Sequence, residues 1–310
     1  MKRKLKIAVL LGGTSLEREV SLNTGAQIIK TLESAGYTVF KYDPKTDLEK
    51  FSLDFKNKKF DFCIPALHGQ GGEDGSIQGY LESLKIPYCF SNIKASAVAM
   101  DKNLSKILLK EKGIEVLNSK LVNNNKDITD LSIDYPVIVK PNQGGSSVNI
   151  NICYDFSELE EAVNIILNNN EEVLIEKYLK EAKELTVSVI EKDNKVLSLP
   201  VMEIIANKGV FYDYNSKYSQ GGSTYICPAE IDKEIYSLAQ KWSKLVFKTI
   251  GARDLARVDY LYDEENKKLY FLEINTIPGM TKTSLMPEAA SKEGYEFIDL
   301  LELIIGNHIK

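Results

Sequence analysis

The sequence has little of what builds disulfide frameworks and structural zinc sites. Its 310 residues contain only four cysteines, scattered without a CxxC spacing, and two histidines. Disulfide-rich domains and structural zinc sites need closely spaced Cys, or Cys and His, residues. We therefore expect neither kind of site, and we expect reduced cysteines in the core of a cytoplasmic protein.

Long apolar runs and an excess of positive charge are also lacking. No stretch is long enough to cross a membrane, and the short apolar run after the N-terminal MKRK lacks the small-residue cleavage site of an export signal. The formal net charge of −5 argues against a broad nucleic-acid-binding surface, although a local basic cluster can still bind a nucleotide. We therefore expect neither nucleic acid nor a membrane as a partner.

A complete dinucleotide signature is missing as well. Residues 5–11 predict a strand that ends at Gly12 and Gly13, and the apolar spacing beyond predicts a helix that ends near Gly36. A strand, a glycine turn and a helix open a doubly wound nucleotide-type domain. Because the full GxGxxG pattern is absent, a nucleotide-dependent oxidoreductase is an alternative with little support.

Polar loops follow two predicted strands of this first region. Glu17 follows the first strand, and His68 opens the glycine-rich loop HGQGGEDG after the strand predicted at 61–67. Ligands of open α/β sheets lie at the carboxyl ends of the strands, so a ligand contact is favoured for His68. Glu17, taken alone, is better explained as surface charge near the start of a helix. A short last strand is predicted at 87–90.

A phosphate-binding loop is predicted in the middle of the chain. One helix is expected over 96–112, and a buried strand at 136–140 delivers Lys140 to the segment NQGGSS. Small residues with free backbone N–H groups beside a lysine form a phosphate cradle, which we favour over a flexible hairpin tip. The GxxxxGK[ST] spacing of a P-loop is absent. Further along, residues 207–224 form a long polar segment typical of a lid.

A predicted hairpin at 256–262 and 269–275 carries a candidate metal site. One register that its turn allows puts Asp259 opposite Glu273 and Arg257 opposite Asn275. Facing carboxylates repel one another, and a divalent cation bound between them would offset this repulsion. Carboxylate and amide oxygens are suitable ligands for Mg²⁺. Two solvated acids on an exposed face remain the alternative. Arg257 could hold an oxyanion or a phosphoryl oxygen, and Gly279 lets a substrate approach the backbone.

This ordered set of motifs resembles the D-alanine–D-alanine ligases of the ATP-grasp superfamily along essentially the whole chain. The stretches that carry the resemblance are GGTSLEREVSLNTG (12–25), ALHGQGGEDGSIQGYLE (66–82), MDK (100–102), VIVKPNQGGSS (137–147), EEVLIEKYL (171–179), FYDYNSKY (211–218), ARVD (256–259) and LEINTIPGMTKTSL (272–285). Two departures are Asn149, where many members have glycine, and the segment KEAK at 180–183, which lacks a glycine often found there.

The resemblance implies a mixed α/β (α+β) ATP-grasp fold with an N-terminal doubly wound, Rossmann-like preATP-grasp domain. It implies three domains, at 1–93, 94–180 and 181–310, the last with the lid at 207–224. The implied reaction joins two D-alanines through a D-alanyl phosphate, releases ADP and phosphate, and serves peptidoglycan precursor synthesis. ATP would be the cosubstrate, with two Mg²⁺ or Mn²⁺ ions, in a cytoplasmic homodimer.

The resemblance also implies roles for single residues. ATP would be bound through phosphate, adenine and ribose contacts by Lys102, Lys140, Ser146, Ser147, Glu176, Lys177, Tyr178, Leu179, Glu184 (ribose), Phe211 and the lid residue Lys217. The metal ligands would be Asp259, Glu273 and Asn275. The first D-alanine would lie by Glu17 and His68, the oxyanion by Arg257 and the Gly279 N–H, and the second D-alanine's carboxylate by Ser284 and Leu285.

Tyr218 matches, with Glu17 and Ser146, a hydrogen-bond network that joins lid, phosphate loop and first domain. A tyrosine at this place goes with an amine nucleophile in the resembled family, so we expect D-alanine as second substrate at neutral pH. A D-alanyl-D-serine or D-alanyl-D-lactate ligase stays an alternative with the same chemistry. A catalytically inactive module that binds ATP or D-alanine is a further one.

Overall fold

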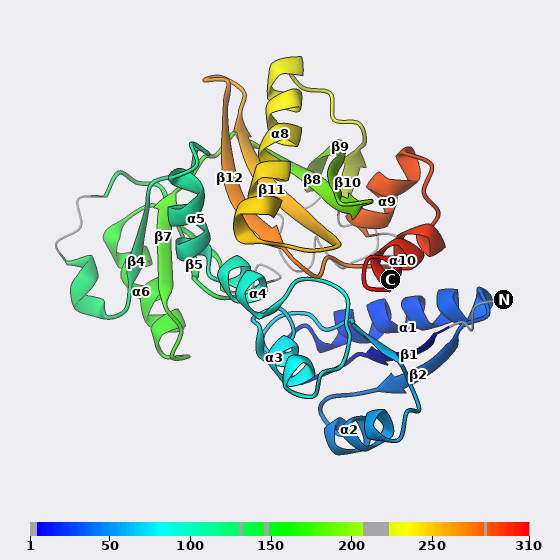
Figure 1. Ribbon diagram of the computed structural model, residues 1–310. Helices are drawn as coiled ribbons and strands as arrows, with labels where there is room; N and C mark the ends of the chain where they lie inside the picture. Colours follow the sequence, from blue (N-terminus) through cyan, green and yellow to red (C-terminus); the bar gives the residue numbers. More distant parts are fainter. Residues whose placement is uncertain (1–4, 130–132, 146–148, 207–222, 282–283, 310) are drawn as a thin grey trace.

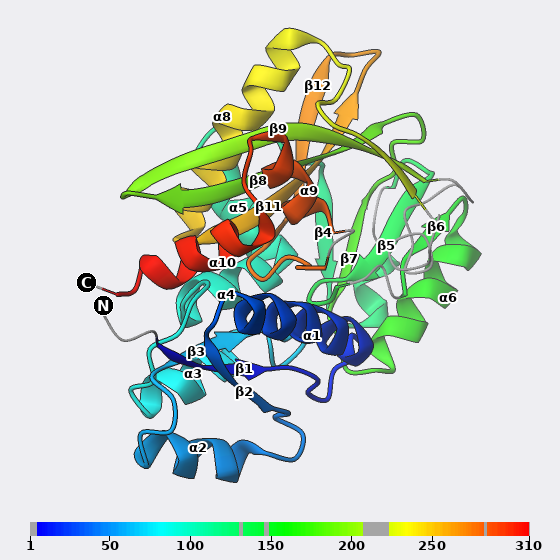
Figure 2. The same cartoon turned by 90° about the vertical axis from the view of Figure 1, so that its right-hand side faces the viewer.

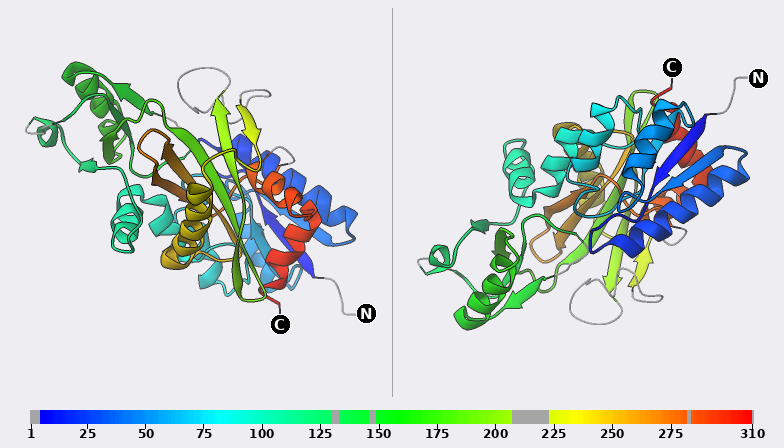
Figure 3. Two further views of the ribbon diagram at one scale, coloured as in Figure 1. Left: turned by 90° about the horizontal axis from the view of Figure 1, so that it is seen from above. Right: turned by 90° about the horizontal axis from the view of Figure 1, so that it is seen from below.

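The computed structural model describes residues 5–129, 133–145, 149–206, 223–281 and 284–309 (Figure 1). These residues form mixed α/β structure around three sheets, which have three, four and five strands. Seen from above and below, the four-stranded sheet lies at one end, the three-stranded sheet at the other, and the five-stranded sheet between them (Figure 3). None of the described helices has the length and apolar character needed to cross a membrane.

The three-stranded sheet belongs to a doubly wound unit, as predicted. Its elements are β1 (Lys6–Leu10), α1 (Arg18–Ser34), β2 (Thr38–Tyr42), α2 (Leu48–Lys56), β3 (Phe62–Pro65) and α3 (Ser76–Ser83). β1 pairs in parallel with both neighbours, and its side chains alternate between two cores. Ile7 and Val9 pack with α1, whereas Leu10 packs with α2 and α3. The continuous apolar run of β1 therefore reflects burial on both faces.

Two predictions for the end of this unit are wrong. The strand expected at 87–90 is only an isolated bridge between Cys63 and Tyr88, because Phe90 takes a positive φ of 70° and turns the chain away. The single helix expected over 96–112 is two helices, α4 (Ile93–Met100) and α5 (Lys102–Lys110). Asp101 separates them: its backbone is extended, and its Oδ1 accepts a 2.8 Å bond from the N–H of Leu104, which caps α5.

The four-stranded sheet is covered by one long helix. Its elements are β4 (Ser119–Val122), the 3-10 helix η1 (Asn125–Ile128), β5 (Val137–Pro141), β6 (Asn151–Cys153), α6 (Phe156–Leu167) and β7 (Val173–Lys177). Val139 and Ile175 of the sheet share a core with Leu159 and Val163 of α6. All three pairs of neighbouring strands run antiparallel.

The five-stranded sheet carries the predicted hairpin. Its elements are β8 (Lys183–Lys192), β9 (Lys195–Ala206), β10 (Ser223–Ile226), α8 (Lys233–Ile250), β11 (Leu255–Asp263) and β12 (Lys268–Asn275). The turn between β8 and β9 places Asp193 and Asn194 at φ of 51° and 59°, the conformation that tight hairpin turns require. α8 packs on one face, with Val246 and Phe247 in the same core as Val187 and Val258.

The last helices, α9 (Leu285–Lys292) and α10 (Phe297–Gly306), lie between the other face of this sheet and α1 (Figure 2). One core joins Ile28 of α1, Ile304 of α10, Met286 of α9 and Leu199 of β9. The first unit and the five-stranded sheet are therefore held together through the C-terminal helices.

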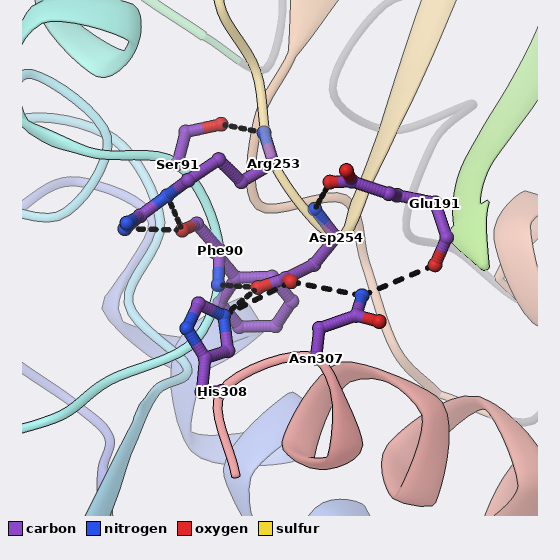
Figure 4. Close-up of polar contacts among 7 residues, drawn as sticks. All are labelled: Phe90, Ser91, Glu191, Arg253, Asp254, Asn307 and His308. Atoms are coloured by element: carbon purple, nitrogen blue, oxygen red, sulfur yellow. Dashed lines mark hydrogen bonds and ion pairs between the residues drawn. The ribbon is translucent and has the colours of Figure 1, made fainter. Parts of the chain in front are cut away.

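A polar network reinforces this connection (Figure 4). The buried carboxylate of Asp254 accepts bonds from the N–H of Phe90 at 2.6 Å, from Asn307 Nδ2 at 3.1 Å and from His308 Nε2 at 2.8 Å. The guanidinium of the adjacent Arg253 donates to the carbonyl oxygen of Phe90 at 2.9 Å. The end of the first unit, the start of β11 and the C-terminal segment thus share one buried anion. The expected domain boundaries themselves stay a prediction.

Candidate active site

Glu17 lies where two glycine-rich loops meet. It is buried, and a Cβ atom built on Gly145 would lie 2.3 Å from its Oε1, while one built on Gly69 would lie 3.1 Å from the same atom. The carboxylate thus lies against the predicted phosphate loop on one side and the loop of His68 on the other. The interpretation of Glu17 as a surface charge is wrong, because it needs only the local sequence, whereas the burial comes from a loop more than 120 positions away.

Lys102 connects the phosphate loop with the acidic hairpin. Its Nζ donates to the carbonyl oxygen of Gly144 at 2.5 Å and lies 3.5 Å from Glu273 Oε2. The break between α4 and α5 makes this position possible, since Asp101 forms a bridge with Gln143 of the loop. Lys102 is buried although it is charged, which indicates that it serves the site rather than the surface.

Asn142 fixes the start of the phosphate loop, and sequence reasoning did not single it out. Its side chain is fully buried, accepts the N–H of Asn103 at 2.9 Å, and donates to Asp101 Oδ1 at 3.1 Å and to Glu172 Oε2 at 2.9 Å. A polar residue placed directly after a buried strand was the available signal. Beyond the loop, Asn149 takes a φ of 58°, a left-handed conformation that asparagine tolerates best after glycine.

A buried ion cluster lies beside this loop. Glu176 of β7 is 1% exposed; its Oε2 lies 2.5 Å from Lys140 Nζ, and its Oε1 contacts Lys106 Nζ. Lys140 and Glu176 were both predicted as ATP-binding residues, and the structure brings them together. Lys106, which was not predicted, is a third member of the cluster, and its position one helical turn after Lys102 was the signal that could have indicated it.

The hairpin has the predicted register, with Asp259 opposite Glu273 and Arg257 opposite Asn275. A bulge at Leu272 then pairs Tyr260 with Phe271. Both of these aromatic residues are fully buried in the core, whereas Glu273 is half-buried beside Asp259. Residues two apart normally share a face of a strand, so the bulge is what lets Phe271 face the core and Glu273 face the site.

Asp259 is surrounded by donors. It is 4% exposed, and its carboxylate accepts from Thr186 Oγ1 at 2.6 Å, from Arg257 at 3.0 and 2.8 Å and from Asn275 Nδ2 at 3.1 Å. The alternative of solvated acids on an exposed face is therefore wrong for Asp259, because this carboxylate is buried and bonded to Thr186 of the neighbouring strand β8.

The donors of the hairpin fit a hard divalent cation. Two carboxylates stand directly opposite one another, with an amide beside them, and Mg²⁺ prefers such oxygen ligands while it takes its other positions from water and phosphate. Within its described ranges the structure shows no group of three or more His, Cys, Asp or Glu residues suited to a metal. The metal assignment of Asp259, Glu273 and Asn275 stays a prediction.

His68 is a neutral group next to the hairpin. It is buried, its Nε2 lies 3.0 Å from Thr24 Oγ1, and it hydrogen-bonds to the backbone of Ile277. Burial, together with the positive charge of Arg257, lowers the pKa of His68 to about 4. The imidazole is therefore uncharged at pH 7, and it joins the first unit to the segment that follows β12.

Glu73 is a carboxyl group of this site that sequence reasoning missed. Its Oε2 accepts the N–H of Gly69 at 2.8 Å. Burial and the negative charge of Glu17 raise the pKa of Glu73 to about 8, so the pair carries less than two negative charges at neutral pH. An acid inside a glycine-rich loop was the available signal.

Ser284 and Gly279 lie side by side before α9. A Cβ atom built on Gly279 would lie 2.9 Å from Ser284 Oγ, which accepts the N–H of Thr281 at 3.0 Å. Leu285, the first residue of α9, is buried. The N–H of Ser284 donates to the carbonyl oxygen of Thr281 at 3.1 Å. The carboxylate site at Ser284 and Leu285 stays a prediction.

The predicted adenine segment follows β7. Lys177 is exposed, Tyr178 and Leu179 are half-buried, and the N–H of Tyr178 donates to the carbonyl oxygen of Pro136 at 3.2 Å. Glu184 lies on β8, opposite Leu261 of β11, and its ribose role stays a prediction.

Other predicted site residues lie outside the described residues: Ser146, Ser147, Phe211, Lys217 and Tyr218, with most of the lid 207–224. The strands that flank this segment pair directly, Ala206 with Ser223.

Comparison with known proteins agrees with this geometry. The family models for the D-ala D-ala ligase C-terminus and N-terminus match residues 108–306 and 41–91. The D-alanine–D-alanine ligase of Carboxydothermus hydrogenoformans is 40% identical over 309 residues, which cover 97% of each chain.

Solved structures give the same result. The crystal structure of D-alanine–D-alanine ligase from Bacillus anthracis complexed with ATP is 34% identical, with a TM-score of 0.80 over 97% of this chain and 96% of that chain. The VanG D-Ala:D-Ser ligase from Enterococcus faecalis is 26% identical, with a TM-score of 0.82 over 99% and 100%. The predicted ATP-grasp fold is confirmed, and the chain belongs to the D-alanine–D-alanine ligase family.

Proposed function

We propose that the protein joins two D-alanines into D-alanyl-D-alanine with ATP, through a D-alanyl phosphate, and so supplies a peptidoglycan precursor. The observation that carries this proposal is the position of Lys102, whose ammonium touches both the phosphate loop at Gly144 and the acidic hairpin at Glu273. A phosphoryl group bound there would be in reach of basic and metal-binding groups at once. The family membership and the ATP-bound relative support the same conclusion.

The first step transfers the γ-phosphoryl group of ATP to the carboxylate of one D-alanine. Phosphoryl transfer asks mainly for positioning and for neutralisation of charge. Lys102 and Lys140 supply positive charge, and the phosphate loop supplies backbone N–H groups. Asp259, Glu273 and Asn275 would hold two Mg²⁺ or Mn²⁺ ions, which, when bound, neutralise the phosphates and the developing charge.

The first D-alanine would lie against Glu17. Its ammonium group needs a buried acceptor, and the Glu17 carboxylate between the loops of Gly69 and Gly145 provides one. The pKa of Glu73, raised to about 8, keeps a full second negative charge from forming beside Glu17 at neutral pH. His68, held neutral by burial, adds a polar group without a competing positive charge.

In the second step the amine of the other D-alanine attacks the acyl phosphate, and phosphate leaves. The attack places negative charge on the carbonyl oxygen, which Arg257 and the N–H of Gly279 would receive. The carboxylate of this second D-alanine would lie at the start of α9, at the backbone of Ser284 and Leu285. The acyl phosphate hydrolyses if water reaches it, so we retain the prediction that residues 207–224 act as a lid.

The experiment that tests the proposal is ADP release by the purified protein with ATP, Mg²⁺ and D-alanine, with L-alanine as control. We expect release that depends on D-alanine, D-alanyl-D-alanine as product, and loss of both in Glu273→Gln. Glu265→Gln, an acid in the exposed turn of the same hairpin, is the matched control and should keep full activity. Absence of turnover with any amino or hydroxy acid would instead favour a module that only binds ATP or D-alanine.

A second candidate product is D-alanyl-D-serine, which the structural likeness to the VanG D-Ala:D-Ser ligase favours. Competition between D-alanine, D-serine and D-lactate for the second position at pH 7 distinguishes these products. We expect D-alanine to dominate, and a preference for either other substrate would replace the main proposal. A homodimer and a cytoplasmic location complete the proposal; sedimentation equilibrium would test the first and cell fractionation the second.

A further inference from the structure

Helix α5 exposes several apolar side chains and buries two lysines, which is the opposite of a usual amphipathic helix. Three of its apolar side chains are exposed, Leu104 at 40%, Ile107 at 53% and Leu108 at 37%. Two of its lysines, Lys102 and Lys106, are instead 7% and 2% exposed. Burying an ammonium group costs free energy unless it is paired, so a helix that buries lysines and exposes leucines indicates a site that needs those charges.

Lys106 pairs with a carboxylate that the sheet holds in place. Glu176 lies on β7, between Ser119 of β4 and Ile138 of β5 in the strand register, so its backbone is fixed on both sides. Lys106 contacts Oε1 of this carboxylate, while Lys140, from β5, lies 2.5 Å from Oε2. Each oxygen therefore has its own cation, and the two cations come from different elements.

The cluster carries an excess of positive charge. Lys102, Lys106 and Lys140 contribute three positive charges against the two carboxylates of Glu176 and Glu273. Burial and the neighbouring ammonium groups of Lys140 and Lys102 lower the pKa of Lys106. A polyphosphate that binds to Lys102 and Lys140 relieves this repulsion. We expect such a polyphosphate to draw Lys140 from Glu176, which would leave Lys106 as the partner of that carboxylate.

We propose that Lys106 is a positioning residue for the nucleotide base: its ammonium holds the Glu176 carboxylate ionised and oriented, with Oε2 turned to accept an N–H of the bound purine. This inference rests on the proposed function in that ATP is the nucleotide. An ionised carboxylate accepts hydrogen bonds and donates none. It selects a base with an exocyclic amine at that edge and rejects one with a carbonyl oxygen there. Lys106 would thus support adenine over guanine without touching the base.

The experiment compares Lys106→Met with Lys110→Met, an exposed lysine on the same helix. Affinities for ADP and GDP are measured by titration calorimetry without D-alanine, so the result does not depend on turnover. We expect Lys106→Met to weaken the affinity for ADP by about 10- to 100-fold, the range of a lost charge-assisted hydrogen bond. The affinity for GDP should weaken by less than about threefold. Lys110→Met should change neither. Equal weakening of ADP and GDP, or no change, would overturn the proposal.

A second comparison keeps the test decisive if Lys106→Met fails to fold. The double variant Lys106→Met/Glu176→Met replaces the buried ion pair by apolar side chains, an exchange that buried pairs often tolerate, and it is compared with Glu176→Met. If Lys106 acts through Glu176, the added Lys106→Met should change the ADP-to-GDP ratio by less than about twofold in that background. A further loss of several-fold would show that Lys106 acts on the nucleotide by another route and would refute its role through Glu176. In kinetic assays of the single variant, KM for ATP should rise while kcat changes little.

Discussion

The guanidinium of Arg257 holds both carboxylate oxygens of Asp259, with Nε 3.0 Å from Oδ1 and Nη2 2.8 Å from Oδ2. A residue assigned to the oxyanion and a residue assigned to the metal are thus paired with one another. The pairing stabilises a carboxylate that is only 4% exposed, and it also competes with a cation for the same oxygens.

Arg257→Met should therefore have opposite effects on two measurements. Without the guanidinium, Asp259 is more available, and the affinity for Mn²⁺ in the absence of nucleotide should rise by about tenfold, as for the loss of one competing ion pair. The kcat should fall by about 10²–10³, because the oxyanion loses a donor. Electron paramagnetic resonance of Mn²⁺ and the ligase assay give the two values. A fall in both would contradict the competition.

Gly145→Ala tests whether Glu17 must lie against the phosphate loop. The added Cβ would lie 2.3 Å from Glu17 Oε1, so the carboxylate has to move. We expect kcat/KM for D-alanine to fall by at least about 10²-fold, as for a misplacement of about 1 Å in a site. Gly144→Ala is the matched control, since its Cβ would meet Pro141 at an ordinary 3.5 Å. Similar losses in both variants would show that the loop, not Glu17, is sensitive.

The raised pKa of Glu73 predicts that the stability of the folded protein falls as pH rises. Its pKa is raised from 4.5 to about 8, so the folded state binds more protons than the unfolded state between these pH values. Stability should therefore fall as pH rises through this window, and it should stay level above it. Glu73→Gln removes this dependence. The Tm of Glu73→Gln minus the Tm of the parent protein should therefore increase from pH 4.5 to pH 8. A Tm difference that stays constant over this range would argue against the raised pKa.

The lowered pKa of His68 predicts that, at lower pH, the stability of the folded protein rises as pH rises. Its pKa is lowered from 6.5 to about 4, so the unfolded state binds more protons between these values, and stability should fall as pH drops from 6.5 to 4. His68→Gln should lose this part of the acid sensitivity while it lowers activity at every pH. Denaturant unfolding at pH 4, 5 and 7 measures the effect. A parent and a variant with parallel pH profiles would contradict the assignment.

Substitution of Asp254 should lower the stability of the protein without changing the reaction that it catalyses (Figure 4). Asp254→Ala removes the acceptor of the Phe90 N–H and of His308, and one of the two acceptors of Asn307. It also places alanine at a φ of 63°. We expect the free energy of unfolding to fall by about 2–5 kcal/mol. Asp254→Asn keeps an acceptor and tolerates this backbone, so it should lose about half as much. Urea titrations measure both, and equal losses would show that the charge, not the hydrogen bonds, matters.

The sequence predicted those parts of the site that depend on local pattern. Alternation along 256–262 and 269–275, together with the length of the turn between them, allows the register that sets Asp259 opposite Glu273. The lysine at the exit of β5 and the glycines after it lie together because they are consecutive. The single helix expected over 96–112 failed at Asp101, because helical spacing continues through a residue whose side chain caps the next helix.

The amino-acid sequence by itself determined the doubly wound first unit, the hairpin with its facing carboxylates and the resemblance to a family, since each rests on residues that are near one another in the chain or on motifs in a fixed order. Only the tertiary structure decided that Glu17 is buried against Gly145, that Lys106 shares Glu176 with Lys140, and that Asp254 binds both Phe90 and the C-terminal segment. These contacts join elements far apart in sequence. Their energies come from burial and charge in a shared interior, which local periodicity does not encode.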